Sequence, residues 1–122
     1  MVLAALLFAA AAQPQPLAGF YRAHQMEVGA ALELDGDGHF QYQLDYGAAS
    51  ESAEGTWSSD GKAVYLTATV MNGMYKQPAF AREPLAIDGN RLLLKRYDTV
   101  IGFELEELPA PAGENKKMTG EK

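Results

Sequence analysis

The sequence contains no cysteine, which excludes a disulfide framework, a thiolate metal site and a thiol nucleophile. Histidine is also scarce, and His24 and His39 stand in no spacing typical of a metal site. A zinc set would need both imidazoles and a carboxylate such as Glu27 or Asp37, so ordinary solvated or capping histidines are the simpler interpretation. The sequence therefore predicts neither a metal ion nor a cofactor.

Lysine and arginine are missing from one part of the chain. None occurs between Arg22 and Lys62, a stretch that holds eight acidic residues, and the whole chain has a net charge of −6. Such a surface repels phosphate backbones, which argues against nucleic acid as a partner, and it could attract a cationic partner. The simpler interpretation is that these acids form solvated strand faces and turns.

Long apolar runs are also few. Residues 1–12 form the one clear example, and as a helix they would span about 18 Å, too short for a bilayer core of about 30 Å. The run ends in an Ala-x-Ala cleavage site, so we interpret it as a signal peptide, although no Lys or Arg precedes it. The alternative is a buried amino-terminal helix. We expect an extended linker at 13–16, one β-barrel domain at 17–108 and a disordered tail at 109–122, in a periplasmic or secreted protein.

The strongest structural signal lies in residues 32–57. Apolar and polar residues alternate on both sides of an Asp-Gly turn at 35–38, and after a short loop Gly55 and Trp57 continue the pattern. Similar patterns predict about eight short strands, at residues 17–23, 30–35, 38–46, 54–58, 63–71, 80–87, 91–97 and 100–108. Pro84 should make part of its strand an edge or a bulge. The fold class is therefore all-β: a single antiparallel meander forming a small up-and-down barrel or half-barrel, with a sandwich as the alternative.

Three family resemblances accompany this pattern. The opening Gly19-Phe20-Tyr21 followed by a β meander resembles the lipocalin-like, or calycin, architecture, whose members use Gly-x-Trp. The block from Leu32 to Trp57 resembles small, uncharacterised exported proteins of proteobacteria, and this likeness brings no activity with it. The length and strand number are also similar to those of periplasmic inhibitors of secreted metalloproteases, which usually carry a disulfide.

The turn Asp35-Gly36-Asp37-Gly38 invites a calcium interpretation. An EF-hand loop starting at Asp35 would need an oxygen ligand at position 5, Gly at 6 and Glu at 12, where this sequence has His39, Phe40 and Tyr46. We therefore expect a plain hairpin turn.

Catalytic motifs are missing as well. The chain has no Gly-x-Ser-x-Gly elbow, and its serines fall in predicted turns and loops. Paired carboxylates could cut a glycosidic bond, but none is flanked by apolar neighbours that would raise the pKa of an acid catalyst. We predict that the protein is not an enzyme.

Aromatic residues are the most informative of those present. They are spread over seven of the predicted strands, and the simpler interpretation is that they fill the core. The functional alternative is a pocket for a small apolar ligand lined by Phe40, Tyr42, Tyr46 and Trp57. We predict that Trp57, the only tryptophan, is buried on the inner face beside the aromatic row, whereas a tryptophan in a pocket would be partly accessible.

The sequence thus favours a non-catalytic, exported binding or interaction module of the bacterial envelope, with a small apolar ligand or an envelope protein as its partner. One alternative is a periplasmic protease inhibitor of small-barrel type that uses residues 13–16 as its inhibitory arm. The other is a carboxylate-based hydrolase.

Overall fold

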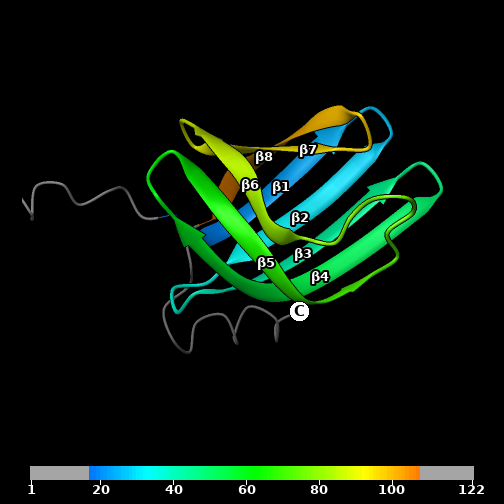
Figure 1. The fold of residues 1–122 in the computed structure, drawn as a ribbon. Helices are drawn as coiled ribbons and strands as arrows, with labels where there is room; N and C mark the ends of the chain where they lie inside the picture. Colours follow the sequence, from blue (N-terminus) through cyan, green and yellow to red (C-terminus); the bar gives the residue numbers. More distant parts are fainter. Residues whose placement is uncertain (1–16, 108–122) are drawn as a thin grey trace, which may run out of the picture.

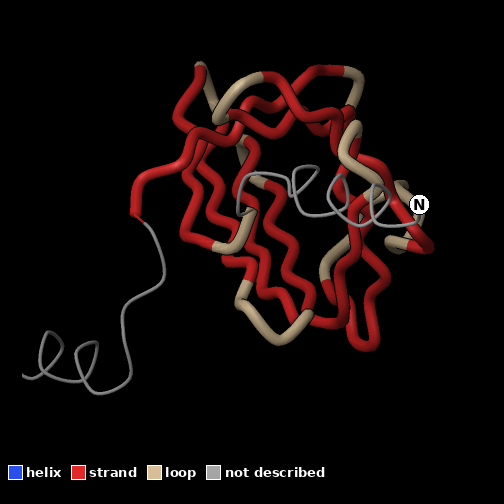
Figure 2. The backbone as a smooth tube through the Cα atoms, turned by 90° about the vertical axis from the view of Figure 1, so that its left-hand side faces the viewer, coloured by secondary structure: helices blue, strands red, loops and turns tan. Residues whose placement is uncertain are grey.

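The computed structural model describes residues 17–107, and the segments expected at 1–12, 13–16 and 109–122 lie outside the described residues. Eight antiparallel strands follow in chain order: β1 (Gly19–Gln25), β2 (Val28–Leu34), β3 (His39–Tyr46), β4 (Ala49–Ser59), β5 (Ala63–Asn72), β6 (Ala81–Asp88), β7 (Arg91–Arg96) and β8 (Thr99–Glu107). Each strand pairs with the next, and β8 returns to pair with β1 (Figures 1 and 2). The meander therefore closes into a small barrel, as predicted, and the sandwich alternative is wrong.

Alternate residues of each strand face the interior. The period-two pattern of β3 buries Phe40, Tyr42 and Leu44 and leaves the residues between them exposed. Side chains of this kind from all the strands fill the barrel, as expected for so narrow a closed sheet. The largest fully buried side chains are Phe40, Phe80, Phe103, Leu32, Leu34, Leu44, Leu66, Leu85, Leu92, Leu94, Ile101 and Val64.

The predicted start of the fourth strand is wrong. β4 begins at Ala49, whereas residues before 54 were expected to be a loop. In the structure a tight turn with Gly47 at φ 58° leads directly into β4, where Glu51 and Ala53 take inner positions. In β1 the buried aromatic is Tyr21, because Phe20 faces outward beside the Arg22 guanidinium, 5.0 Å from its ring centroid.

Gly55 lies at a β-bulge, where the pairing of β4 with β5 shifts by one residue because Thr69 of β5 has no partner. A Cβ atom at this position would lie 2.1 Å from the backbone oxygen of Thr67 and 2.8 Å from the backbone nitrogen of Thr69. The two strands therefore approach more closely than any side chain at position 55 would permit.

The ladder between β6 and β7 is short. It holds three residue pairs, of which Ala86↔Leu93 is the farthest from the turn. Ile87 donates its N–H toward β5, so by the alternation of an antiparallel ladder position 84 should donate toward β7. Pro84 has no N–H to donate, so the ladder stops there and Pro84 lies on an unpaired edge of its strand, as its sequence predicts.

The β4–β5 turn supports a prediction about acid unfolding. Asp60 Oδ1 accepts the N–H groups of Lys62 and Ala63 at 2.9 Å each, and Oδ2 accepts the hydroxyl of Tyr65 at 2.9 Å. These bonds, the two backbone ones first, lower the pKa of Asp60 from 3.8 to about 2. A depressed folded-state pKa means that the stabilisation is complete above about pH 4 and is lost as pH falls toward 2.

We therefore expect Asp60→Asn to lower the urea midpoint at pH 7, and we expect the midpoints of variant and wild type to converge as pH falls from 4 to 2. Urea titrations at a series of pH values check this. A difference between the two midpoints that stays constant down to pH 2 would contradict it.

Candidate functional site

The four aromatic residues predicted to line a pocket do not meet at one place. Phe40 and Tyr42 are buried in the core, where their ring centroids lie 6.5 and 4.8 Å from that of Phe80. Tyr46 is half-buried at the far end of β3, 5.2 Å from the ring of Tyr97. Trp57 lies at the opposite end of the barrel, so these residues form a column through the interior.

Trp57 shares the inner face of β4, as predicted, but it is half-buried where full burial was expected. It lies one position beyond the end of β3, because Thr56 is opposite His39. Its indole N–H donates to the backbone oxygen of Asp35 at 2.9 Å, and its backbone N–H donates to the backbone oxygen of Gly38 at 2.9 Å. The indole therefore fastens the β2–β3 turn across the end of the barrel.

A buried ion pair, which the sequence analysis did not identify, lies at the other end. Arg96 Nε and Nη2 donate to Glu51 Oε2 and Oε1 at 2.7 and 3.0 Å. The hydroxyls of Tyr42 and Tyr97 donate to the same carboxylate at 2.6 and 3.0 Å. Glu51 is 2% exposed and Arg96 3%. This carboxylate therefore accepts four hydrogen bonds inside the barrel.

The surroundings of this cluster stabilise its charges. Burial acts to lower the pKa of Arg96, but the hydrogen bonds and negative charge of Glu51 outweigh it and raise the pKa. Burial, followed by the hydrogen bond to Glu51, raises the pKa of Tyr42. No buried side-chain nitrogen or oxygen of the described residues lacks a hydrogen-bond partner. The charges of Glu51 and Arg96 cancel, and all their buried polar atoms have hydrogen-bond partners. We therefore interpret the pair as part of the structure and not as a binding site.

The segment between β5 and β6 covers this end of the barrel (Figure 1). Arg96 Nη1 donates to the backbone oxygen of Pro78 at 2.8 Å, and Phe80, 2% exposed, inserts its ring among the core aromatics. The guanidinium carbon of Arg96 lies 4.8 Å from the centroid of that ring. A small apolar ligand at this end would have to displace the side chain of Phe80.

One carboxyl group contradicts the expectation that no acid has a raised pKa. Glu83 shares the face of β6 that buries Leu85 and is itself half-buried. Burial raises its pKa, while the charge of Arg96 acts in the opposite direction. Its sequence neighbours Arg82 and Pro84 give no sign of this, because the desolvation comes from the tertiary position on the inner face of the barrel.

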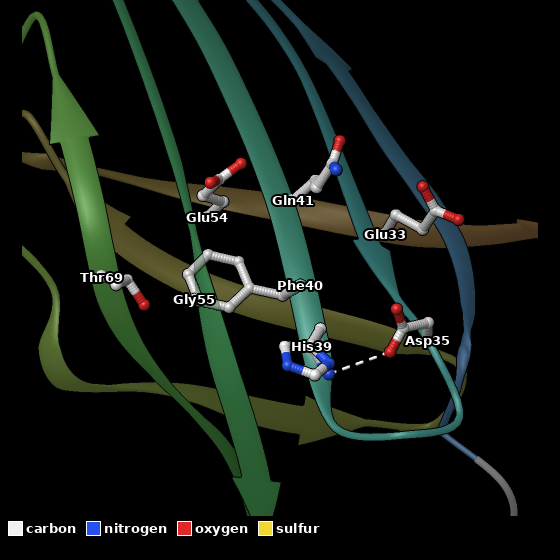
Figure 3. Close-up of a pocket in the computed structure, with 8 residues that line it drawn as sticks. All are labelled: Glu33, Asp35, His39, Phe40, Gln41, Glu54, Gly55 and Thr69. Atoms are coloured by element: carbon white, nitrogen blue, oxygen red, sulfur yellow. Dashed lines mark hydrogen bonds between the residues drawn. The ribbon is translucent and has the colours of Figure 1, made fainter.

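The outer surface of β2 to β5 carries a hollow of about 390 Å³, which we call the acidic hollow. Glu33, Gln41 and Glu54 form a row across its floor, since Glu33 pairs with Gln41 and Gln41 with Glu54 (Figure 3). Asp35 and His39 lie nearer the β2–β3 turn. The complete lining is Glu33, Asp35, His39, Phe40, Gln41, Glu54, Gly55 and Thr69.

The charge of the acidic hollow has one sign, because three carboxylates and no Lys or Arg line it. A second hollow, on the outer side of β1, β7 and β8, is different. There Arg22 Nε lies 3.4 Å from Glu106 Oε1, and Arg91 Nη2 lies 3.1 Å from Asp88 Oδ2. The second hollow therefore neutralises much of its own charge, whereas the acidic hollow does not.

Comparisons with known proteins place the chain in no group: it matches no family model, no curated protein and no solved structure. The eight-stranded antiparallel barrel does fit the lipocalin-like pattern. Within residues 17–107 no helix is long and apolar enough to cross a membrane.

Proposed function

We propose that the protein is a non-catalytic binding module of the bacterial envelope that recognises a positively charged segment of a partner protein at the acidic hollow. The observation that carries this proposal is the row of Glu33, Gln41 and Glu54, in a concave surface lined by no lysine or arginine. Export and a proteobacterial source are part of the proposal, and their support is the sequence of residues 1–12 and the resemblance of residues 32–57.

The shape of the site supports a side-chain-sized target. The hollow of about 390 Å³ lies beside the bulge between β4 and β5, and Gly55 and Thr69 at this bulge form part of its lining. Carboxylates of two strands flank the amide of Gln41, so a guanidinium or ammonium group could be hydrogen-bonded from both sides. Because these groups face solvent, each contact should contribute modestly and depend on salt.

The interior supports a small apolar ligand less well. Phe40 and Tyr42 are buried among the other core side chains, which leaves no space for a ligand beside them. Glu51 and Arg96 already have hydrogen-bond partners within the protein. The protease-inhibitor alternative uses residues 13–16, which lie outside the described part of the chain. Both alternatives stay predictions of the sequence.

The proposal predicts selective binding of basic peptides. We expect a short labelled peptide of alternating Arg and Ala to bind at low ionic strength, and its Glu counterpart to fail to bind. The double variant Glu33→Gln/Glu54→Gln should weaken binding about five- to tenfold, since two exposed charge contacts contribute about 0.5 kcal/mol or more each. Fluorescence anisotropy with labelled peptides measures both effects.

The second hollow provides the matched control. Glu104→Gln/Glu106→Gln makes the same change in net charge on the other outer face and should leave peptide binding unchanged. Equal weakening by both double variants would mean that only the net charge attracts the peptide, and the proposed site would then be wrong.

A further inference from the structure

The β2–β3 turn brings three potential metal ligands together at the edge of the acidic hollow. Asp35, Asp37 and His39 each offer one ligand atom, and these atoms all lie within 4.8 Å of one another. The imidazole of His39 distinguishes the group from a purely acidic patch, since it adds a nitrogen donor that transition metals prefer over oxygen. We propose that this turn binds a divalent transition-metal ion, with Zn²⁺, Ni²⁺ and Cu²⁺ as the class that fits.

The separations suit a small ion. Two ligands that are each about 2.1 Å from one tetrahedral ion lie about 3.4 Å apart. His39 Nδ1 and Asp37 Oδ1 are 3.2 Å apart, close to that value. Asp35 is half-buried and its Oδ1 accepts the backbone N–H of His39 at 2.9 Å, which leaves its second carboxylate oxygen for the ion. Three protein ligands leave room for water. Calcium would require six or more oxygen ligands, which this turn does not provide.

The local charge also favours a cation. Within residues 17–107 neither Asp35 nor Asp37 forms an ion pair with Lys or Arg, and the ion pair of Asp37 is with His39 itself. Glu33 from the acidic hollow adds a further negative charge nearby. Two carboxylates this close repel each other, and a bound divalent ion would relieve that repulsion.

Trp57, on the inner face at the end of the barrel, holds the turn and also makes metal binding there observable. The indole N–H donates to the backbone oxygen of Asp35 at 2.9 Å, so the only tryptophan lies beside one proposed ligand residue. Paramagnetic Cu²⁺ or Ni²⁺ bound at the turn should therefore quench its fluorescence. Zn²⁺ does not quench tryptophan in this way, but it should compete with Ni²⁺ and reverse the quenching.

The test uses the full chain after treatment with EDTA. We expect Ni²⁺ to quench Trp57, Zn²⁺ to restore the emission, and isothermal titration calorimetry to show one binding event. His39→Gln should weaken Ni²⁺ binding about tenfold or more, and Asp37→Asn should also weaken it. His24→Gln is the matched control, because it removes the only other imidazole, in β1.

Unchanged Ni²⁺ affinity in His39→Gln, or equal losses in the two histidine variants, would overturn the inference. Far-ultraviolet circular dichroism of His39→Gln should match that of wild type, since the imidazole is exposed. The site does not depend on the proposed function: Glu33→Gln/Glu54→Gln should leave zinc binding within about twofold of wild type while it weakens binding of the basic peptide. The two proposals can therefore fail separately.

Discussion

Replacing Glu51 by alanine should lower the free energy of unfolding by about 3–5 kcal/mol, because Arg96 would keep its charge in the interior without a counter-ion. The hydroxyls of Tyr42 and Tyr97 would lose their acceptor at the same time. For a domain of this size the loss approaches the whole stability. Urea unfolding followed by Trp57 fluorescence and by circular dichroism measures it.

Two further variants separate burial from charge. Glu51→Leu/Arg96→Met removes both charges and should recover most of the loss, since replacing a buried pair with apolar residues of similar volume is often neutral or stabilising. Glu106→Ala removes one partner of an exposed pair and should change stability by about 1 kcal/mol or less. If Glu51→Ala lowers the free energy of unfolding no more than Glu106→Ala does, then the interaction between Glu51 and Arg96 does not stabilise the fold.

Replacing Gly55 by alanine should cost about 3 kcal/mol or more, because the new methyl group would meet the backbone of β5. A clash with backbone cannot be relieved by a rotamer change, so the bulge between β4 and β5 would have to widen. We expect a large fall in the urea midpoint, and weaker binding of basic peptides because Gly55 and Thr69 at this bulge line the acidic hollow.

Gly29→Ala is the matched control for that variant. Gly29 lies within β2, and a Cβ atom there would find no other heavy atom within 4 Å. Alanine at position 29 should therefore change stability by less than about 1 kcal/mol and could raise it, through the lower entropy of the unfolded chain. Similar losses in the two variants would mean that strand propensity, and not the close approach of β5, explains the effect at Gly55.

The barrel was predictable because its signals are local. The Asp-Gly turn before His39 and the alternation through Tyr46 depend on neighbouring residues alone, and a meander of hairpins needs little more. The start of β4 was missed because Ser50, Glu51 and Ser52 have the composition of a loop. Their strand pairing becomes visible only when the interior position of Glu51 is known.

The candidate sites were less predictable because their residues meet through the fold. Arg96 lies 45 positions from Glu51, and no spacing rule connects them. The desolvation of Glu83 has the same origin. The alternation of Leu92 and Leu94 does place Arg96 on the inner face of its strand, so a charged residue in phase with buried ones was the available signal. By contrast, the ligands at the β2–β3 turn are two residues apart, as are the first three ligands of an EF-hand, and His39 at the third of these positions was taken as a reason against calcium without considering a transition metal at this turn.

The short ladder between β6 and β7 has a consequence for how the native state opens. Sub-global opening should begin along this line, because few backbone hydrogen bonds cross it. A side-chain hydrogen bond supplements the ladder there, because Arg96 of β7 donates to the backbone oxygen of Pro78 in the segment that leads into β6. If the contact between β6 and β7 breaks, the barrel becomes an open sheet with two unpaired edge strands. Such edges allow strand exchange between two copies of the chain. We therefore expect variants that lose Arg96 to self-associate more readily than wild type.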